Sequence, residues 1–316
     1  MLKNRILSTL KFFDLQDYPL TLLELHKFLA ADWAELKLHL NSQGELIENR
    51  QPEPQVRVDE VLSCIDNECQ GQVENYLGFY YLSGRKDIVS ARLRNYHFGL
   101  AREKLIYRYT KALRFLPFVR GVGLAGSQAM GQQKESSDID LFVIVRPDFM
   151  WLARTIITAY FQVLGKRRYD GHITNRFCLN HYVMGPKEIT KLKNLYTASE
   201  YLKLRPLTYR HSLWQFQKIN EPWLKAFFPN IKLNHPETEM ASRIQTFLEK
   251  LFANRFGLWL DNVLKNWQLP QIRTEKFIVV EEDELSFHPE SKQQGLLADF
   301  AKFQKQQERV SVKLVV

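Results

Sequence analysis

The chain of 316 residues has a globular composition, with 45% hydrophobic and 25% charged residues and a formal net charge of +9. A length of this kind suits about two or three domains, each able to bury its own core. Three cysteines without Cys-x-x-Cys spacing argue against a disulfide framework and against a zinc site. Lys11 and Asp14 interrupt the first apolar residues, so we expect no secretory signal, no membrane span and a cytoplasmic protein.

The first 86 residues predict a small helical module that ends in a β-hairpin. Apolar residues recur at helical spacing over residues 6–13, and Thr21 with Glu24 has the form of a capping box at the start of a second helix. Residues 73–76 and 78–82 alternate as two paired strands do. Helices followed by a hairpin form the order of a winged helix.

The charge of this module differs from that of the chain as a whole. Residues 1–86 contain 9 Lys and Arg against 13 Asp and Glu, whereas residues 87–125 contain 8 against 2. Because phosphate contacts require cations, the acidic module is expected to have a structural or partner-binding role and is disfavoured as a DNA binder. The basic residues of the second segment lie on a long predicted helix over 92–114, and most such runs form a solvated face.

A spaced pair of short motifs follows this helix. Residues 119–125 predict a short buried strand, which runs directly into Gly126-Ser127. Ten residues later comes Asp138-Ile139-Asp140, at the start of an apolar strand over 139–145.

A glycine permits a sharp turn whose amides can point at phosphate oxygens. Strand alternation places Asp138 and Asp140 on one face, about 7 Å apart at the backbone. Two carboxylates this close require a cation, and Mg²⁺ or a pair of Mg²⁺ ions fits oxygen ligands and phosphate substrates.

At these residues the chain resembles the DNA polymerase β-like nucleotidyltransferase superfamily. Its signature is an apolar residue, Gly, then Gly or Ser, a gap of about nine to thirteen residues, and Asp-apolar-Asp. The resemblance implies that Gly126 and Ser127 hold the phosphates of a nucleoside triphosphate. It also implies that Asp138 and Asp140 bind metal. The chain further resembles, over about two-thirds of its length, uncharacterised prokaryotic proteins with a winged-helix segment ahead of this domain.

The superfamily usually adds a third carboxylate on a later strand. The best candidate strand spans 177–184, where the polar residue is Asn180, which can orient a water but cannot accept a proton as a carboxylate does. Asp148, at the start of a predicted helix, and Asp170, in a predicted loop, are weaker substitutes. Cys178 on the same strand is expected to be a small buried packing residue.

The polar residues near these motifs include a basic cluster with two interpretations and two histidines. Lys166, Arg167 and Arg168 form either a solvated cluster or a positive rim that attracts a nucleotide. His172 and His181 flank the Asn180 strand, and each is expected to be a neutral histidine with one hydrogen bond.

The rest of the chain is expected to be largely helical. Helices are predicted over 149–164 and 187–204, and an aromatic cluster is predicted around Trp214 and Trp223. The acidic run 281–284 is expected to be a solvated loop.

The sequence therefore predicts an α/β (α+β) fold. It would comprise a winged-helix-like module (1–86), a polymerase β-like core with a mixed sheet (87–186) and a C-terminal helical region (187–316). The first hypothesis is a Mg²⁺-dependent nucleotidyltransferase acting on an unknown hydroxyl of an RNA, a protein or a small molecule. Asn180 motivates a second, a non-catalytic nucleotide-binding protein of the same fold. The third is a winged-helix regulator that binds nucleic acid.

Overall fold

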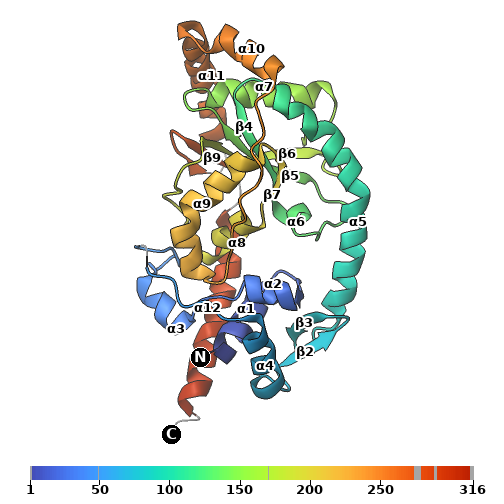
Figure 1. Ribbon diagram of the computed structural model, residues 1–316, viewed down its shortest axis with the longest axis vertical. Helices are drawn as coiled ribbons and strands as arrows, with labels where there is room; N and C mark the ends of the chain where they lie inside the picture. The colour runs from blue at the N-terminus through green and yellow to red at the C-terminus, as the bar shows by residue number, and fades with distance from the viewer. Residues whose placement is uncertain (1, 49, 170, 274–278, 288–289, 314–316) are drawn as a thin grey trace.

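The structure, a computed structural model, describes residues 2–48, 50–169, 171–273, 279–287 and 290–313. Helices surround two β-sheets, a three-stranded sheet near the N-terminus and a six-stranded sheet in the middle of the molecule (Figure 1). None of the helices in these ranges is both long enough and apolar enough to cross a membrane.

The N-terminal module contains the expected helices and hairpin. In chain order it consists of α1 (Leu2–Asp14), β1 (Leu20–Thr21), α2 (Leu22–Lys27), α3 (Trp33–Leu36), η1 (Lys37–His39), α4 (Val58–Glu68), β2 (Val73–Tyr76) and β3 (Phe79–Leu82). The capping box is confirmed, since the Thr21 amide donates to Glu24 Oε2 at 2.8 Å and Thr21 Oγ1 accepts from the Glu24 amide at 3.3 Å. The predicted hairpin is confirmed as well, and β1 pairs with β3 to add a third strand.

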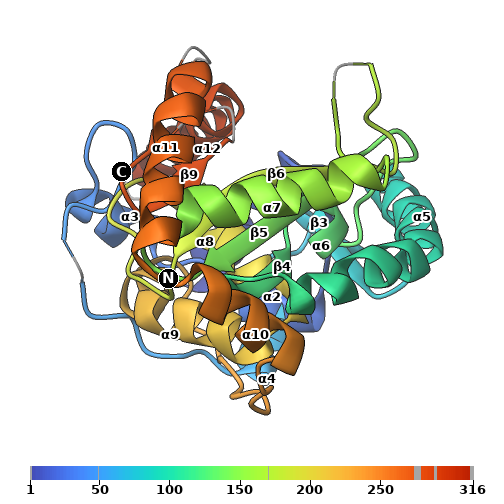
Figure 2. The same ribbon diagram turned by 90° about the horizontal axis from the view of Figure 1, so that it is seen from above.

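The central part of the chain forms a mixed sheet. Its elements are α5 (Asp87–Thr110), η2 (Lys111–Phe115), β4 (Val119–Leu124), α6 (Gly126–Ala129), β5 (Ile139–Val145), α7 (Met150–Val163) and β6 (Phe177–Met184). β4 and β5 are antiparallel, whereas β5 and β6 are parallel and are connected by α7, which crosses the sheet (Figure 2). Alternate residues of β5 enter two separate cores. Leu141 and Val143 pack on the α7 side, and Phe142 and Ile144 pack on the other.

The C-terminal part covers the second face of the sheet and also extends the sheet at both edges. Its elements are α8 (Leu195–Lys203), β7 (Arg205–Thr208), α9 (Arg210–Phe227), α10 (Arg243–Phe252), α11 (Arg255–Arg273), β8 (Val279–Val280), β9 (Glu284–Ser286) and α12 (Glu290–Lys313). The six strands lie in the order β7-β4-β5-β6-β9-β8. The region is therefore mainly helical, and it contributes three strands as well.

Two expectations for this region are wrong. The helix predicted over 187–204 begins only at Leu195, because Asn194 is extended and its side chain accepts from the Thr197 amide at 3.0 Å, which caps the helix there. The acidic run 281–284 is not wholly a solvated loop, because Glu284 lies in β9 and is buried.

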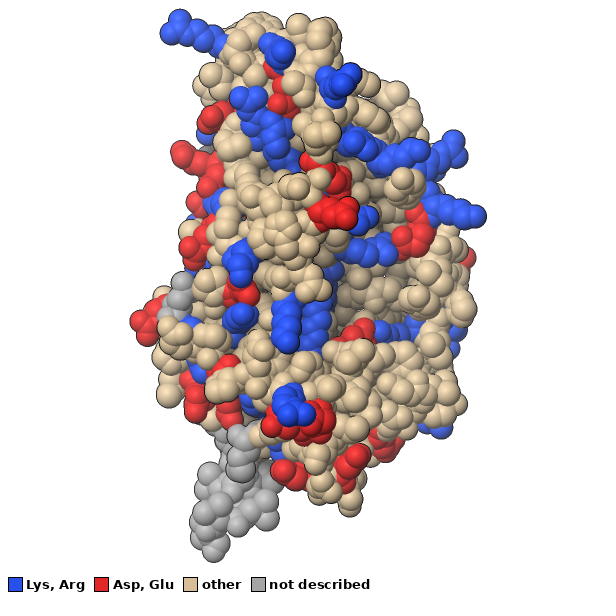
Figure 3. Space-filling view, viewed as in Figure 1, with Lys and Arg blue, Asp and Glu red and all other residues tan. Residues whose placement is uncertain are grey.

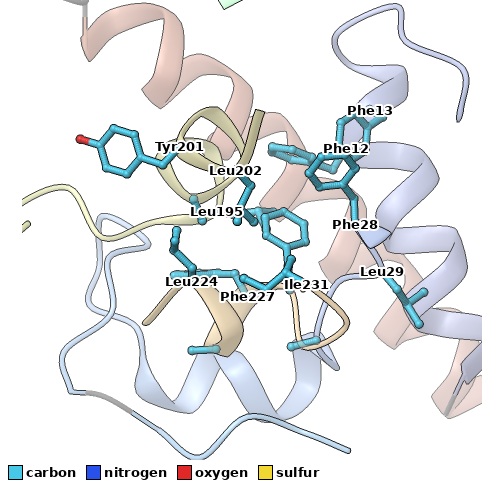
Figure 4. Close-up of a cluster of buried hydrophobic side chains, with 14 of the residues drawn as sticks. Phe12, Phe13, Phe28, Leu29, Leu195, Tyr201, Leu202, Leu224, Phe227 and Ile231 are labelled. Carbon is cyan, nitrogen blue, oxygen red and sulfur yellow. The ribbon is translucent and has the colours of Figure 1, made fainter. Parts of the chain in front are cut away.

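One hydrophobic core joins the two ends of the chain. Phe12 of α1 and Phe28, the C-cap of α2, lie near Leu202 of α8 and Ile231, which follows α9 (Figure 4). Phe300 of α12 packs edge-on against Phe12, with the ring centroids 5.8 Å apart. The N-terminal module is thus held to the rest of the molecule by apolar burial, the main stabilising contribution in folding.

The aromatic cluster predicted in this region is correct only in part. Trp223 is fully buried in the shared core. Trp214, in contrast, lies against His211 and His235, with ring centroids 5.5 and 4.4 Å away.

The start of α7 is capped by a residue from another helix. The helix predicted over 149–164 is present, but it begins at Met150, so Asp148 lies outside it. Its N-cap side chain makes no hydrogen bond, and the buried carboxylate of Asp261 in α11 instead accepts from the Leu152 amide at 2.7 Å. Burial raises the pKa of Asp261 to about 6.

Replacing Asp261 by asparagine is expected to stabilise the protein at pH 7.5 by about 2 kcal/mol. The folded-state pKa of about 6 lies above the unfolded value of about 3.9. Protonated Asp261 therefore makes its full contribution to the free energy of unfolding below pH 4, and this contribution is lost as the pH rises through 6. Asparagine keeps the acceptor oxygen without the charge. Urea denaturation at pH 7.5 and pH 4 should show a gain only at the higher pH, and exposed Asp299→Asn should show none at either. A loss of stability for Asp261→Asn at pH 7.5 would contradict this account.

Candidate active site

The turn after β4 admits only a glycine at position 126. Gly126 has φ +61°, and a Cβ atom placed on it would lie 2.4 Å from Oδ2 of Asp140. The strand pairing causes this close approach, since the Ala125 amide donates to the Asp140 carbonyl at 3.0 Å. The first residue of α6 and the Asp140 carboxylate are therefore in direct contact.

Three potential metal ligands lie together at this end of the sheet. Ligand atoms of Asp138, Asp140 and Cys178 all fall within 4.8 Å of one another, and all three residues are half-buried. Asp140 and Cys178 are register partners in the parallel β5–β6 pair, so their side chains project from the same face. The structure thus brings the two aspartates together as the spacing predicts, and it adds a thiol.

Arg168 is the cation that now faces this cluster. Its Nη1 donates to Asp138 Oδ2 at 2.5 Å and to Cys178 Sγ at 3.5 Å. Burial raises the pKa of the Cys178 thiol to about 12, and the nearby charge of Asp140 adds to this shift. The thiol is consequently protonated at neutral pH.

The loop between the two motifs is fixed from α5 and from within. Buried Arg102 of α5 donates to the carbonyl of Lys134 at 3.0 Å and also to that of Glu135. The buried side chain of Gln133 donates to the Asp138 carbonyl at 2.6 Å. These contacts hold the backbone ahead of the aspartates in one position.

The other basic residues of the predicted rim do not reach the carboxylates. Lys166 lies over the ring of Tyr109, with Nζ 5.4 Å from the ring centroid, and Arg167 is exposed. Among the described residues, Arg168 alone of the three has an ion pair with Asp138.

The remaining candidates for the third ligand of this site are Asn180, Asp170 and Asp148. Asn180 lies in β6, but its side chain is outside the described part of the structure, as is the whole of Asp170. Asp148 follows the far end of β5, roughly 20 Å from Asp138 at the rise of a strand, so it cannot be a third carboxylate of this site.

The two histidines behave differently from each other. His172 is exposed and stacks on Tyr169, with ring centroids 4.5 Å apart. His181 is buried and lies 3.0 Å from Glu284 Oε1, so its expected hydrogen bond is present.

Sequence reasoning assigned Cys178 to packing alone, and the structure places it at the site. The sequence does contain a signal for this position, because both strands begin with an apolar residue, Ile139 and Phe177. Aligning these two residues places Cys178 opposite Asp140, which is the observed register. A shift in the register follows, so that His181 rather than Asn180 pairs with Phe142.

A pocket of about 650 Å³ adjoins this cluster between α8 and the face of the sheet that carries Asp140. Ala125 and Phe142 form its wall next to the site, and Tyr196 and Tyr201 of α8 form the opposite wall. Its size and its mixture of aromatic and polar walls suit an organic ligand.

The donor set fits a divalent cation between the two aspartates. Carboxylate oxygens are hard ligands that suit Mg²⁺, whereas a thiol is a soft ligand better suited to zinc or copper. The side chains that would hold Mg²⁺ are therefore Asp138 and Asp140, with Cys178 beside them.

Comparison with protein-family models matches residues 106–180 to the nucleotidyltransferase domain. Comparison with curated proteins and with solved structures gave no match. The matched range begins in the last turn of α5 and ends in β6, so it contains the Gly126 turn, both aspartates and Cys178. Residues 106–180 thus carry a nucleotidyltransferase domain, in line with the DNA polymerase β-like superfamily.

Proposed function

We propose that the protein is a Mg²⁺-dependent nucleotidyltransferase that transfers a nucleoside monophosphate from a nucleoside triphosphate to a hydroxyl, with release of pyrophosphate. The observation that carries the proposal is the convergence of Asp138 and Asp140 beside the Gly126 turn, within the matched domain. Phosphoryl transfer depends mainly on positioning and charge neutralisation, and these residues supply both.

Each residue has a distinct part in this proposal. Gly126 and Ser127 bind phosphate oxygens of the nucleotide at the turn, and Asp138 and Asp140 hold Mg²⁺. When bound, Mg²⁺ neutralises charge on the phosphates. Arg168, which pairs with Asp138, would supply a positive charge beside the phosphates. Lys166 and Arg167 extend the positive rim around it.

The test is pyrophosphate release by the purified full-length chain, with each of the four nucleoside triphosphates and a cell extract as the source of acceptor. Mass spectrometry of the labelled product then identifies the acceptor. Release that depends on Mg²⁺ and on one triphosphate supports the proposal. No release with any of the four triphosphates would oppose it.

The second candidate is a non-catalytic nucleotide-binding protein, and one feature of the site supports it. Cys178, the register partner of Asp140, stands where a carboxylate would complete a cluster of three. A protonated thiol neither binds Mg²⁺ well nor accepts the proton of an attacking hydroxyl.

Replacing Cys178 by aspartate is expected to raise Mg²⁺-dependent transfer by at least about tenfold, because a general base typically contributes 10²–10⁴-fold. Cys178→Ser is the matched control, since it is similar in size and adds no carboxylate. Asn180→Asp tests the neighbouring position in the same way. An inactive wild type with an active Cys178→Asp variant would favour the non-catalytic candidate. A wild type that already turns over a nucleotide at an enzyme-like rate would exclude it.

We also propose that the N-terminal module is of the winged-helix type and has a structural role. Its helix α4 exposes Asp59, Glu60, Asp66 and Glu68, which disfavours contact with duplex phosphates. In this proposal the protein acts in the cytoplasm, a reducing environment that suits its three cysteines, all present as thiols.

A further inference from the structure

A basic cleft separates the N-terminal module from the nucleotidyltransferase domain. It has a volume of about 1010 Å³, and its lining residues include Lys27 of α2, Arg92 and Tyr96 of α5, Met130 after α6, Lys203 of α8 and Arg205 of β7. The face shown in Figure 3 is hollowed between these parts of the molecule, with Lys and Arg side chains around the hollow. Four chain segments that are distant in sequence therefore build one cavity.

The charge of this basic cleft is positive after its ion pairs are formed. Both carboxylates that line it are already paired with arginines, Glu24 with Arg92 and Glu103 with Arg205, each at 2.6 Å. Lys27 is exposed and has no ion-pair partner among the described residues. Lys203 pairs with Glu200 at 3.7 Å, so the charge that an entering anion meets uncompensated is that of Lys27.

Helix α5 lines the cleft between Arg92 and Glu103, and its surface, continued by η2, exposes aromatic rings among cations. Between Arg94 and Phe115 the sequence has a single carboxylate, Glu103. The exposed aromatic side chains are Tyr96, Phe98, Tyr107 and Phe115, and the exposed cations are Arg94, Lys104, Arg108, Lys111 and Arg114. A solvated face accounts for the cations, but it does not account for four exposed rings among them. Cations that bind phosphates and rings that stack on bases are the combination that binds single-stranded nucleic acid.

The basic cleft leads to the candidate active site. Helix α6 touches Asp140 at Gly126, and its last residues, Gln128 and Ala129, line the cleft. Ala129 is three residues after Gly126 in α6, so the two places are about 4.5 Å apart along its axis. On the other side, Lys166 over Tyr109 connects α5 to the segment between α7 and β6 that bears Arg168.

We propose that the basic cleft and the exposed face of α5 bind single-stranded nucleic acid as the acceptor of the transfer. This inference rests on the proposed function and names its acceptor. The terminal hydroxyl oxygen of the strand forms a bond to the α-phosphorus, the bond between the α-phosphorus and its bridging oxygen breaks, and pyrophosphate leaves. The hydroxyl proton passes to water. Duplexes are disfavoured because their bases are not free to stack on the rings.

The test measures binding separately from catalysis. Fluorescein-labelled 20-nucleotide single strands of RNA and of DNA are titrated with the full chain in EDTA, without nucleotide, at several salt concentrations. Lys27→Glu is expected to weaken binding about tenfold and to make the slope of log K against log salt shallower by about 0.7 per lost phosphate contact. Tyr96→Ala is expected to weaken binding about tenfold with the salt slope unchanged, because stacking releases no counterions. Lys302→Glu, on the exposed face of α12, is the control for charge alone and should bind as wild type does.

The outcomes separate the inference from the proposed function. Single-strand binding that both cleft variants weaken supports the inference, and the RNA and DNA arms show which strand is preferred. A duplex of equal length that binds as tightly, or variants that bind as wild type does, would overturn it. Pyrophosphate release with an acceptor that is not nucleic acid, in a protein that binds no single strand, would overturn the inference and leave the transferase proposal standing.

Discussion

Replacing Asp138 and Asp140 together by alanine is expected to lower the rate of pyrophosphate release by at least about 10³-fold. A metal cation contributes several kcal/mol to stabilising the charge of the transition state, and each 1.36 kcal/mol corresponds to a tenfold change in rate. Both carboxylates lie within 4.8 Å of each other and would hold that cation together. The measurement is the initial rate of Mg²⁺-dependent pyrophosphate release at saturating nucleotide.

The loss should arise from the site and not from unfolding. The double substitution removes two like charges from one place, so its thermal midpoint is expected to equal or exceed that of wild type. Asp299→Ala on α12, whose carboxylate pairs only with Lys302 in the described structure, is the matched control and should keep full activity. Equal rates for wild type and the double variant would remove Asp138 and Asp140 from the chemistry.

Replacing Gly126 by alanine is expected to lower the same rate by about 10²-fold, because a displacement of about 1 Å in a reacting group can cost that much. The added Cβ would lie 2.4 Å from Asp140 Oδ2, so the carboxylate must move. The backbone at φ +61° is also unfavourable for alanine, which adds a stability cost of about 1–2 kcal/mol.

A control substitution at a second glycine separates the effect on activity from the effect on stability. Gly71 has φ +74°, and an added Cβ there meets no atom within 4 Å. Gly71→Ala should therefore lose a similar amount of stability and keep its activity. Wild-type activity in Gly126→Ala, with only the stability loss of Gly71→Ala, would show that the contact with Asp140 does not position the carboxylate.

The features that sequence predicts well here are local ones. The capping box at Thr21, the hairpin over residues 73–82 and the apolar strand after Asp138 depend on neighbours within a few residues, and all three are present. One wrong prediction depends on distant partners, since Glu284 is buried because β9 pairs with β6 and places it against His181. The other is local: helix α8 starts late because Asn194 caps it through the Thr197 amide, a signal within a few residues that the prediction over 187–204 did not use.

For the candidate site, the sequence by itself determined the Gly126 turn and the shared face of Asp138 and Asp140. Turn geometry and strand alternation act within one short segment, so they can be read without the fold. Only the tertiary structure decided that Cys178 and Arg168 complete the cluster and that the N-terminal module forms one wall of a basic cleft. Strand register and the packing of distant helices fix those positions, and both are set by burial across the whole molecule.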